Sequence, residues 1–239
     1  MDVPRCMDLN ADLGEGVTDD VGLLSVVTSA NVACGFHAGD QETMRMVCDE
    51  AAVRGVAVGA QVSYDDRPNF GRVHMDVAYD VLRDLVAEQV ELLGAIAAAA
   101  GTEVAYVKPH GALYNRVVHD EQQARAVLDG SGALPVLGLP GSVVLSLAAA
   151  IGRPVHREGF PDRAYTDDGR LLPRSEPGAV LHDPEAIAAR AVELALSGQI
   201  DSVCVHGDSP SAVLSARAVR GALERAGFEV RPRAWGVGA

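Results

Sequence analysis

Short apolar runs alternate with longer amphipathic stretches along the chain. Each run is rich in β-branched residues and is bounded by Gly, Pro or Asp, which is the pattern of a buried strand. In the longer stretches apolar residues recur every three or four positions, as Leu82, Val86, Val90 and Leu93 do. The sequence therefore predicts strands at residues 6–11, 30–34, 55–62, 103–108, 134–139, 153–158 and 201–206, and helices at 41–54, 76–100, 119–130, 141–151, 183–197 and 209–226.

Strands that alternate with helices pair in parallel through right-handed crossovers. An open doubly wound sheet and a closed (β/α) barrel both fit this order. No linker, low-complexity tract or repeat divides the sequence, so one domain over residues 1–239 is expected. Both alternatives are α/β folds, and the position of the polar residues favours the closed one, a seven-stranded (β/α) barrel.

Three helix starts carry capping signals. Asp183 precedes Pro184, which predicts an N-cap followed by proline at the first helical position. Ser209 and Pro210 open the last predicted helix in the same way, and Asp40 is expected to cap the helix that begins near Gln41.

Polar side chains follow most of the predicted strands at their C-terminal ends, which form the active-site face of a (β/α) barrel. The loops at the opposite ends are shorter and richer in Gly and Ala. This asymmetry predicts a functional site built from Asn10, Asp12, Glu15, His37, Asp40, Gln61, Ser63, Tyr64, Lys108, His110, Tyr114, Asn115, Glu158, Asp162, Arg163, His206 and Asp208.

Lys108 is the only lysine in the chain, because the other basic residues among the 20 Lys and Arg are all arginine. It ends an apolar run in VAYVKPHGALYN, directly before Pro109 and His110. A solvated surface charge is one interpretation of this position and an active-site cation is the other. Partial burial at a strand end would also tune the pKa of a lysine, which arginine does not offer.

DLNADLGEG places Asp8, Asn10 and Asp12 at alternate positions, so a strand points all three to one side. If buried, they need bonds to one another, to a ligand or to a metal. The other interpretation is a hydrogen-bonded loop start. Asp12, His37 and His206 would supply three metal ligands if they converged, but a catalytic metal is not expected from the sequence.

The formal net charge of −13 argues against nucleic acids and anionic membranes as partners. No stretch approaches about 18 uninterrupted apolar residues, and the start lacks a signal-peptide core, so a cytoplasmic protein is expected. The Cys residues show no CxxC spacing, and GxSxG and Walker A motifs are absent. A P-loop ATP site is therefore excluded, which argues against a P-loop kinase.

Six blocks together resemble the lactam-utilisation (LamB/YcsF) family. They occur in the family's order over nearly the whole chain: DLNADLGEG, SANVACGFHAGD, NFGRVHM, VKPHGALYN, EGFPDRAYTDDGRLLPRSEPGA and VCVHGDSPSAV. The resemblance implies a barrel of the glycoside hydrolase/deacetylase type. It also implies the ATP-dependent opening of 5-oxoproline to L-glutamate, as the A subunit of a 5-oxoprolinase that works with partner subunits B and C.

One departure concerns the segment after the third strand. Family members commonly read GAHPGYPD there, whereas this chain has GAQVSYDD, with Gln61 in place of a histidine. Glutamine forms hydrogen bonds but does not titrate, so Gln61 argues against a metal or a base at this position.

The resemblance and the strand ends together predict roles for the site residues. Asp12 or His37 is expected to be the general base, Lys108 to stabilise negative charge or a phosphoryl group, and His110 to protonate the leaving nitrogen. Substrate contacts are expected from Asn10, Gln61, Tyr64, Asn115, Glu158, Arg163, His206 and Asp208.

ATP is expected to bind with the help of the partner subunits. A divalent ion is expected only as the Mg²⁺ that accompanies ATP. A homo-oligomer is compatible with the sequence. Two other functions fit the same residues: a stand-alone metal-dependent deacetylase or hydrolase acting on carbohydrate-like substrates, and a non-catalytic protein that binds a small acid.

Overall fold

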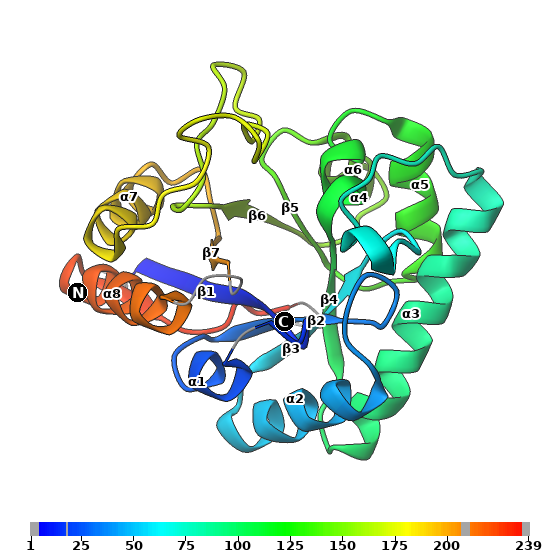
Figure 1. Cartoon of the computed structure of the whole chain (residues 1–239), viewed down its shortest axis with the longest axis horizontal. Helices are drawn as coiled ribbons and strands as arrows, with labels where there is room; N and C mark the ends of the chain where they lie inside the picture. Colours follow the sequence, from blue (N-terminus) through cyan, green and yellow to red (C-terminus); the bar gives the residue numbers. More distant parts are fainter. Residues whose placement is uncertain (1–4, 18, 207–210, 236–239) are drawn as a thin grey trace.

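A computed structural model describes residues 5–17, 19–206 and 211–235 of the chain. Its seven parallel strands pair in the order β2-β3-β4-β5-β6-β7-β1, and β1 pairs again with β2 (Figure 1). The sheet is therefore a closed barrel, and the open alternative is excluded. The strands are β1 (Arg5–Leu13), β2 (Ser29–Ala33), β3 (Ala57–Val62), β4 (Val104–Pro109), β5 (Val136–Gly138), β6 (Val155–Gly159) and β7 (Ser202–Val205).

Helices surround the barrel on its outside (Figure 1). All six predicted helices are confirmed to within a few residues, except that residues 207–210 at the predicted start of the last one lie outside the described chain. The six are α2 (Gln41–Arg54), α3 (Tyr79–Ala99), α5 (Glu121–Gly130), α6 (Val143–Ala150), α7 (Pro184–Leu196) and α8 (Ala212–Arg225). None of the helices in the described ranges is long and apolar enough to cross a bilayer.

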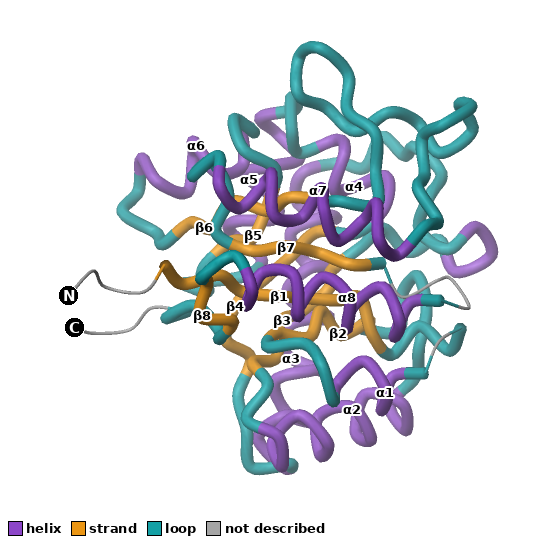
Figure 2. Tube along the Cα trace, turned by 90° about the vertical axis from the view of Figure 1, so that its left-hand side faces the viewer, coloured by secondary structure: helices purple, strands orange, loops and turns teal. Residues whose placement is uncertain are grey.

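Four short elements were not predicted, because each is too short to show a hydrophobic period. They are α1 (Asp20–Leu24), the 3₁₀ turn η1 (Arg67–Asn69), α4 (Gly111–Arg116) and the strand β8 (Phe228–Val230). β8 pairs with the first residues of β1, Arg5 to Met7, and so extends the sheet at the N-terminal end of the barrel (Figure 2).

Two predicted N-caps are confirmed. The Asp40 carboxylate accepts a hydrogen bond of 2.8 Å from the backbone N–H of Thr43. Asp183 accepts from the N–H groups of Glu185 and Ala186, with Pro184 at the first helical position. Each cap satisfies N–H groups that a helix start leaves unpaired.

The apolar core lies between the barrel and the helices. Leu9, Ala11 and Leu13 on the outer side of β1 are fully buried, as are Met44 and Val47 on the inner face of α2. Burying one side chain of the size of Leu or Val contributes about 1.5–3 kcal/mol. The alternation along β1 therefore fixes which side of each strand faces the helices.

The inside of the barrel is polar. The Asp8 carboxylate accepts hydrogen bonds from the hydroxyl groups of Thr28, Ser29 and Ser202. Asn10 donates to Ser202 Oγ at 2.7 Å and accepts from Asn31 Nδ2 at 2.7 Å. Side chains of β1 thus bond residues of β2 and β7, which confirms the prediction that one side of β1 is polar and bonded.

Asp8 makes the stability of the fold depend on pH. Burial raises the pKa of Asp8 above its ordinary value of 3.8, against the opposing hydrogen bonds from Ser202, Ser29 and Thr28. A carboxyl group with a raised pKa in the folded state contributes stability below the unfolded pKa and loses it as the pH rises through the folded pKa. We expect the unfolding free energy of the wild type, relative to Asp8→Asn, to fall as the pH rises from 3.8 into the neutral range.

Urea unfolding of both proteins at several pH values in this window measures that difference. The exposed Asp49→Asn variant is the matched control for the loss of one carboxylate. A difference between wild type and Asp8→Asn that is constant with pH would show that Asp8 does not titrate in this way.

Candidate functional site

A pocket of about 460 Å³ lies at the C-terminal ends of the strands. Its size is typical of sites for small molecules. Its walls come from the segments after β1 and after β3 to β7, as the asymmetry of the loops predicted. The residues with predicted roles that line it are Asp12, Lys108, His110, Asn115, Arg163 and His206.

The long connection between β6 and α7 forms one wall of the pocket and projects from the barrel at the top of Figure 1. Two isolated antiparallel bridges, Arg163 with Val180 and Tyr165 with Leu171, fold it back on itself. The buried Arg163 guanidinium donates to the carbonyl groups of Ala179 and Leu172 at 3.3 and 2.6 Å. Arg163, predicted to bind substrate, therefore also holds this wall in place.

Lys108 is buried, which rules out a solvated surface charge. Its Nζ lies 3.0 Å from Asp12 Oδ1 and 2.8 Å from Glu158 Oε1. Burial alone would lower the pKa of Lys108, but the charges of the Asp12 and Glu158 carboxylates outweigh it and raise that pKa well above the ordinary value. Lys108 therefore stays an ammonium ion. Partial burial was expected to tune the pKa of Lys108, but the pKa is raised and does not shift toward the free amine.

Asp12 is held as a carboxylate. Burial would raise its pKa, but Lys108, followed by His206 and His110, lowers the pKa of Asp12 below its ordinary value. Oδ1 also accepts a hydrogen bond of 2.8 Å from Asn31. A carboxylate with so low a pKa is a weak base, so the geometry favours a role for Asp12 in positioning Lys108 over general-base catalysis.

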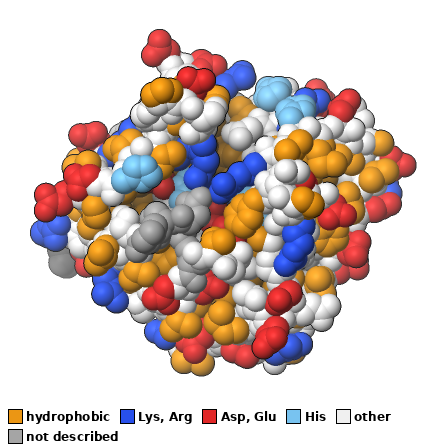
Figure 3. All heavy atoms as spheres, viewed as in Figure 1, with side chains coloured by type: hydrophobic (Ala, Val, Ile, Leu, Met, Phe, Trp, Pro, Cys, Tyr) orange, Lys and Arg blue, Asp and Glu red, His pale blue; other side chains and the backbone are white. Residues whose placement is uncertain are grey.

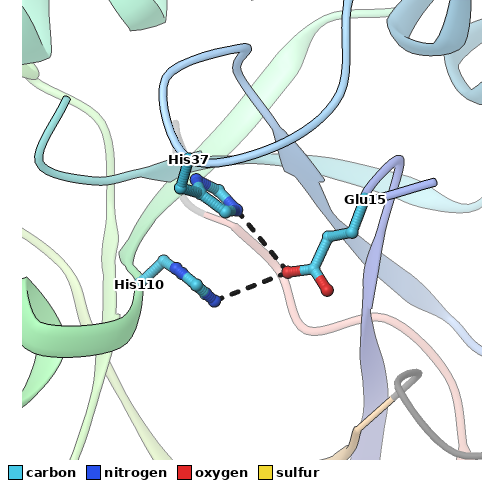
Figure 4. A group of neighbouring side chains, drawn as sticks. All are labelled: Glu15, His37 and His110. Atoms are coloured by element: carbon cyan, nitrogen blue, oxygen red, sulfur yellow. Dashed lines mark ion pairs between the residues drawn. The ribbon is translucent and has the colours of Figure 1, made fainter. Parts of the chain in front are cut away.

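Glu15, His37 and His110 point toward one another, and Figure 4 shows both rings directed at the same carboxylate oxygen. In each case histidine Nε2 lies 3.5 Å from Glu15 Oε1. The two rings are stacked, with centroids 3.9 Å apart, and Phe70 packs edge-on against both. Of the described residues these three form the group suited to hold a metal ion, rather than Asp12, His37 and His206.

Gly71 lets its loop pass close to both histidines. Its φ of +66° is in the left-handed region, and a Cβ there would lie 2.9 Å from His37 Cβ and 3.3 Å from His110 Nδ1. Burial, followed by the neighbouring His37, lowers the pKa of His110 well below its ordinary value. His110 is therefore neutral near pH 7, which does not favour its predicted role as the acid that protonates the leaving nitrogen.

His206 forms a dyad with Asp162. Its Nδ1 lies 2.7 Å from Asp162 Oδ2, and Phe160 stacks on the imidazole with ring centroids 5.3 Å apart. Burial would raise the pKa of Asp162, but His206 outweighs it and lowers that pKa. A carboxylate that fixes one ring nitrogen leaves the other to exchange protons with a ligand.

Three other residues that were predicted to contact substrate do not line the pocket: Asn10, Gln61 and Tyr64. Asn10 and Gln61 are in the barrel interior, where both polar atoms of Gln61 have no hydrogen-bond partner in the described chain. Tyr64 donates to Gln123 of α5 at 2.9 Å and does not line the pocket, so its predicted substrate contact is not supported. Asp208 lies outside the described residues.

Several residues that line the pocket have no role predicted from the sequence. Glu15 and Tyr114 follow strands β1 and β4, and burial raises the pKa of Tyr114 well above its ordinary value, which keeps the phenol protonated. Arg72, Arg170 and Arg174 also line it, and Figure 3 shows Lys and Arg side chains gathered around the hollow on this face. These three arginines lie in the blocks NFGRVHM and GRLLPRS. The sequence did not single them out as site residues, because arginine is common throughout this chain.

A family model described as the LamB/YcsF family matches residues 7–236. The chain belongs to the LamB/YcsF family. Among its relatives in this family, the A subunit of 5-oxoprolinase from Streptomyces avermitilis is 57% identical over 94% of this chain and 98% of the relative. The A subunit of 5-oxoprolinase from Mycobacterium leprae is 49% identical over 95% and 98% of the two chains.

A solved structure supports the same assignment. The lactam utilization protein from Thermus thermophilus has a TM-score of 0.88 and 39% identity over 95% of this chain and 99% of that one. The catalytic domain of a peptidoglycan N-acetylglucosamine deacetylase from Eubacterium rectale has a TM-score of 0.56 at 15% identity, over 97% of this chain and 90% of that one. This second likeness concerns the fold alone, a barrel of the deacetylase type.

Proposed function

We propose that this chain is the lactam-opening subunit of an ATP-dependent 5-oxoprolinase, which converts 5-oxo-L-proline to L-glutamate. The observation that carries the proposal is the similarity over nearly the full length to chains named as the A subunit of 5-oxoprolinase. That name implies further subunits, and we take them to be the B and C subunits of the same enzyme.

The pocket suits a small anionic lactam. Arg72, Arg170 and Arg174 surround it in a chain whose formal net charge is −13, so positive charge is concentrated where a carboxylate would bind. The Lys108 ammonium and the Tyr114 phenol are donors that would hold the lactam oxygen, on which negative charge develops when water adds to the carbonyl carbon.

His206 is the base that we assign to the attacking water. Asp162 fixes Nδ1 of the ring, so Nε2 is left to accept the water proton and to return it to the ring nitrogen as the C–N bond breaks. Ring opening consumes one water across the C–N bond.

ATP enters this reaction because a planar amide is a poor electrophile. Phosphorylation of the amide oxygen by ATP, with release of ADP, would remove its resonance. Addition of water and cleavage of the C–N bond would then leave an acyl phosphate, and a second water would release inorganic phosphate from it to give L-glutamate. The partner subunits are the place for the phosphorylation, since this sequence has no Walker A motif. Mg²⁺ would accompany the nucleotide there. Lys108 would then neutralise charge on the phosphoryl group as well.

Reconstitution tests the proposed function. Glutamate release from 5-oxoproline and ATP is measured for this chain alone, for the B and C subunits alone, and for the mixture. We expect release in the mixture only. No release in any combination of folded proteins would contradict the proposal and favour a metal-dependent hydrolase, for which the Glu15, His37 and His110 group is the supporting observation.

A further inference from the structure

Three buried side chains at the barrel mouth face one another without satisfying their polar atoms. Glu15, His37 and His110 are 8%, 1% and 8% exposed. Glu15 Oε1 and His37 Nε2 have no hydrogen-bond partner in the described chain, since the 3.5 Å that separates them is long for a hydrogen bond. Buried polar atoms without partners are rare, because each loses its hydration without compensation.

The hydrogen bonds around His37 fix which of its nitrogens carries the proton. The Ser63 hydroxyl donates to the carbonyl of Tyr64 at 3.0 Å, so it must accept from His37 Nδ1, 2.9 Å away. Nδ1 is therefore the protonated nitrogen and Nε2 presents a lone pair to Glu15 Oε1. Two lone pairs that face each other repel unless a cation lies between them.

Hydrogen bonds through a proton do not account for the way these three side chains are placed. His110 Nε2 lies at the same distance, 3.5 Å, from the same oxygen, and its ring is stacked on that of His37. An Nε2–H group that donated to Glu15 would bring its nitrogen to about 2.7–3.2 Å from the oxygen, whereas both nitrogens lie 3.5 Å from it. A metal ion accepts a lone pair from all three side chains at once.

The distances fit a metal coordination shell. Nitrogen and oxygen ligands about 2.0–2.2 Å from a tetrahedral Zn²⁺ lie about 3.3–3.6 Å from one another. Both Nε2 to Oε1 distances, 3.5 Å, fall in this range, and one candidate ligand atom of each residue lies within 4.8 Å of the others. Ser63 in turn orients His37, as second-sphere partners of metal-binding histidines do.

We propose that Glu15, His37 and His110 bind one divalent transition-metal ion, with Zn²⁺ as the best match. Two imidazoles and one carboxylate favour Zn²⁺ or a neighbouring transition metal over Mg²⁺, which prefers oxygen ligands. Three protein ligands leave a position open, and Glu15 and His110 line the pocket, so the open position is accessible to a ligand in it. When bound, such an ion polarises a carbonyl or phosphoryl oxygen.

The site does not involve residue 61, so glutamine at that position does not argue against it. It stands on contacts within this chain and holds whether or not 5-oxoproline is the substrate. Metal binding is therefore measured without an activity assay and its outcome is separate from the reconstitution experiment.

The test uses the full-length, untagged chain after treatment with a chelator. Zn²⁺, Co²⁺ and Mg²⁺ are each titrated by calorimetry, and the bound metal is counted by elemental mass spectrometry. We expect one Zn²⁺ per chain, a Co²⁺ complex with visible d–d absorption, and much weaker binding of Mg²⁺. Glu15→Gln and His37→Gln are expected to weaken Zn²⁺ binding at least tenfold, and Ser63→Ala by about 10–100-fold.

His182→Gln removes an exposed histidine outside the cluster and is the matched control, with unchanged affinity expected. Circular dichroism shows whether each variant is folded. The proposal is overturned if the wild type binds no stoichiometric Zn²⁺, or if Glu15→Gln and His37→Gln bind it as tightly as the wild type. If both of these variants fail to fold, Ser63→Ala decides, and an unchanged affinity there overturns the proposal.

Discussion

Lys108→Met is expected to lower glutamate release by the reconstituted enzyme by at least about 10²–10³-fold, the effect of losing one donor that stabilises a developing oxyanion. Lys108 is the buried cation between Asp12 and Glu158 and lines the pocket. Methionine has a similar length and no charge, so the substitution removes the ammonium and preserves most of the shape. The rate kcat with saturating 5-oxoproline and ATP is the measurement.

The same substitution also tests the buried ion pairs. Removing one partner of such a pair destabilises a protein by about 3–5 kcal/mol, because the remaining charges are left uncompensated. Without Lys108, the pKa of Asp12 would rise. Lys108→Met should then be most destabilised at neutral pH and recover as the pH falls, because its folded state takes up protons that the unfolded state does not.

A double variant separates activity from stability. Lys108→Met with Glu158→Gln has one buried carboxylate fewer, so it should regain part of the lost unfolding free energy and remain inactive. Turnover close to wild type in folded Lys108→Met would remove Lys108 from the chemistry and leave it a structural role only.

His206→Gln is expected to lower kcat by about 10²–10⁴-fold, the usual contribution of a general acid–base residue. Glutamine retains hydrogen-bonding capacity toward Asp162 but does not exchange a proton with water near pH 7. Asp162→Asn should also lower kcat, because the amide no longer fixes the imidazole with a negative charge. KM should change less than kcat in both variants, since the dyad acts on the water and not on the substrate carboxylate.

Steady-state kinetics of both variants in the reconstituted enzyme provide the check, with His182→Gln as a control for the loss of an exposed histidine. A pH profile of kcat/KM that keeps its wild-type shape in His206→Gln would assign the titrating base to another residue. A tenfold rise in KM with an unchanged kcat would place His206 in substrate binding, as the sequence alone predicted.

The sequence alone determined the alternation of strands and helices, because the periods of its apolar residues are local, and the polar residues at the strand ends favoured a barrel over an open sheet. Leu9, Ala11 and Leu13 alternate with Asp8, Asn10 and Asp12, and this alternation already separates a helix-facing side from a polar side. Asp40 and Asp183 cap helices through contacts within a few residues, so their roles also follow from the sequence. The single lysine also marked the site, because the sequence around it shows that it lies at the end of an apolar strand.

Only the tertiary structure decided which of the polar residues meet. Lys108 bonds Asp12 across 96 positions of the chain, and His206 meets Asp162 across 44. Barrel closure and strand register bring Glu15 to His37 and His110, and they direct Tyr64 toward α5 instead. The protonation states depend on these contacts as well, because burial lowers the pKa of His110 while carboxylates outweigh burial at Lys108. A strand pattern specifies the side on which a residue lies, whereas its partners are set by the closed sheet.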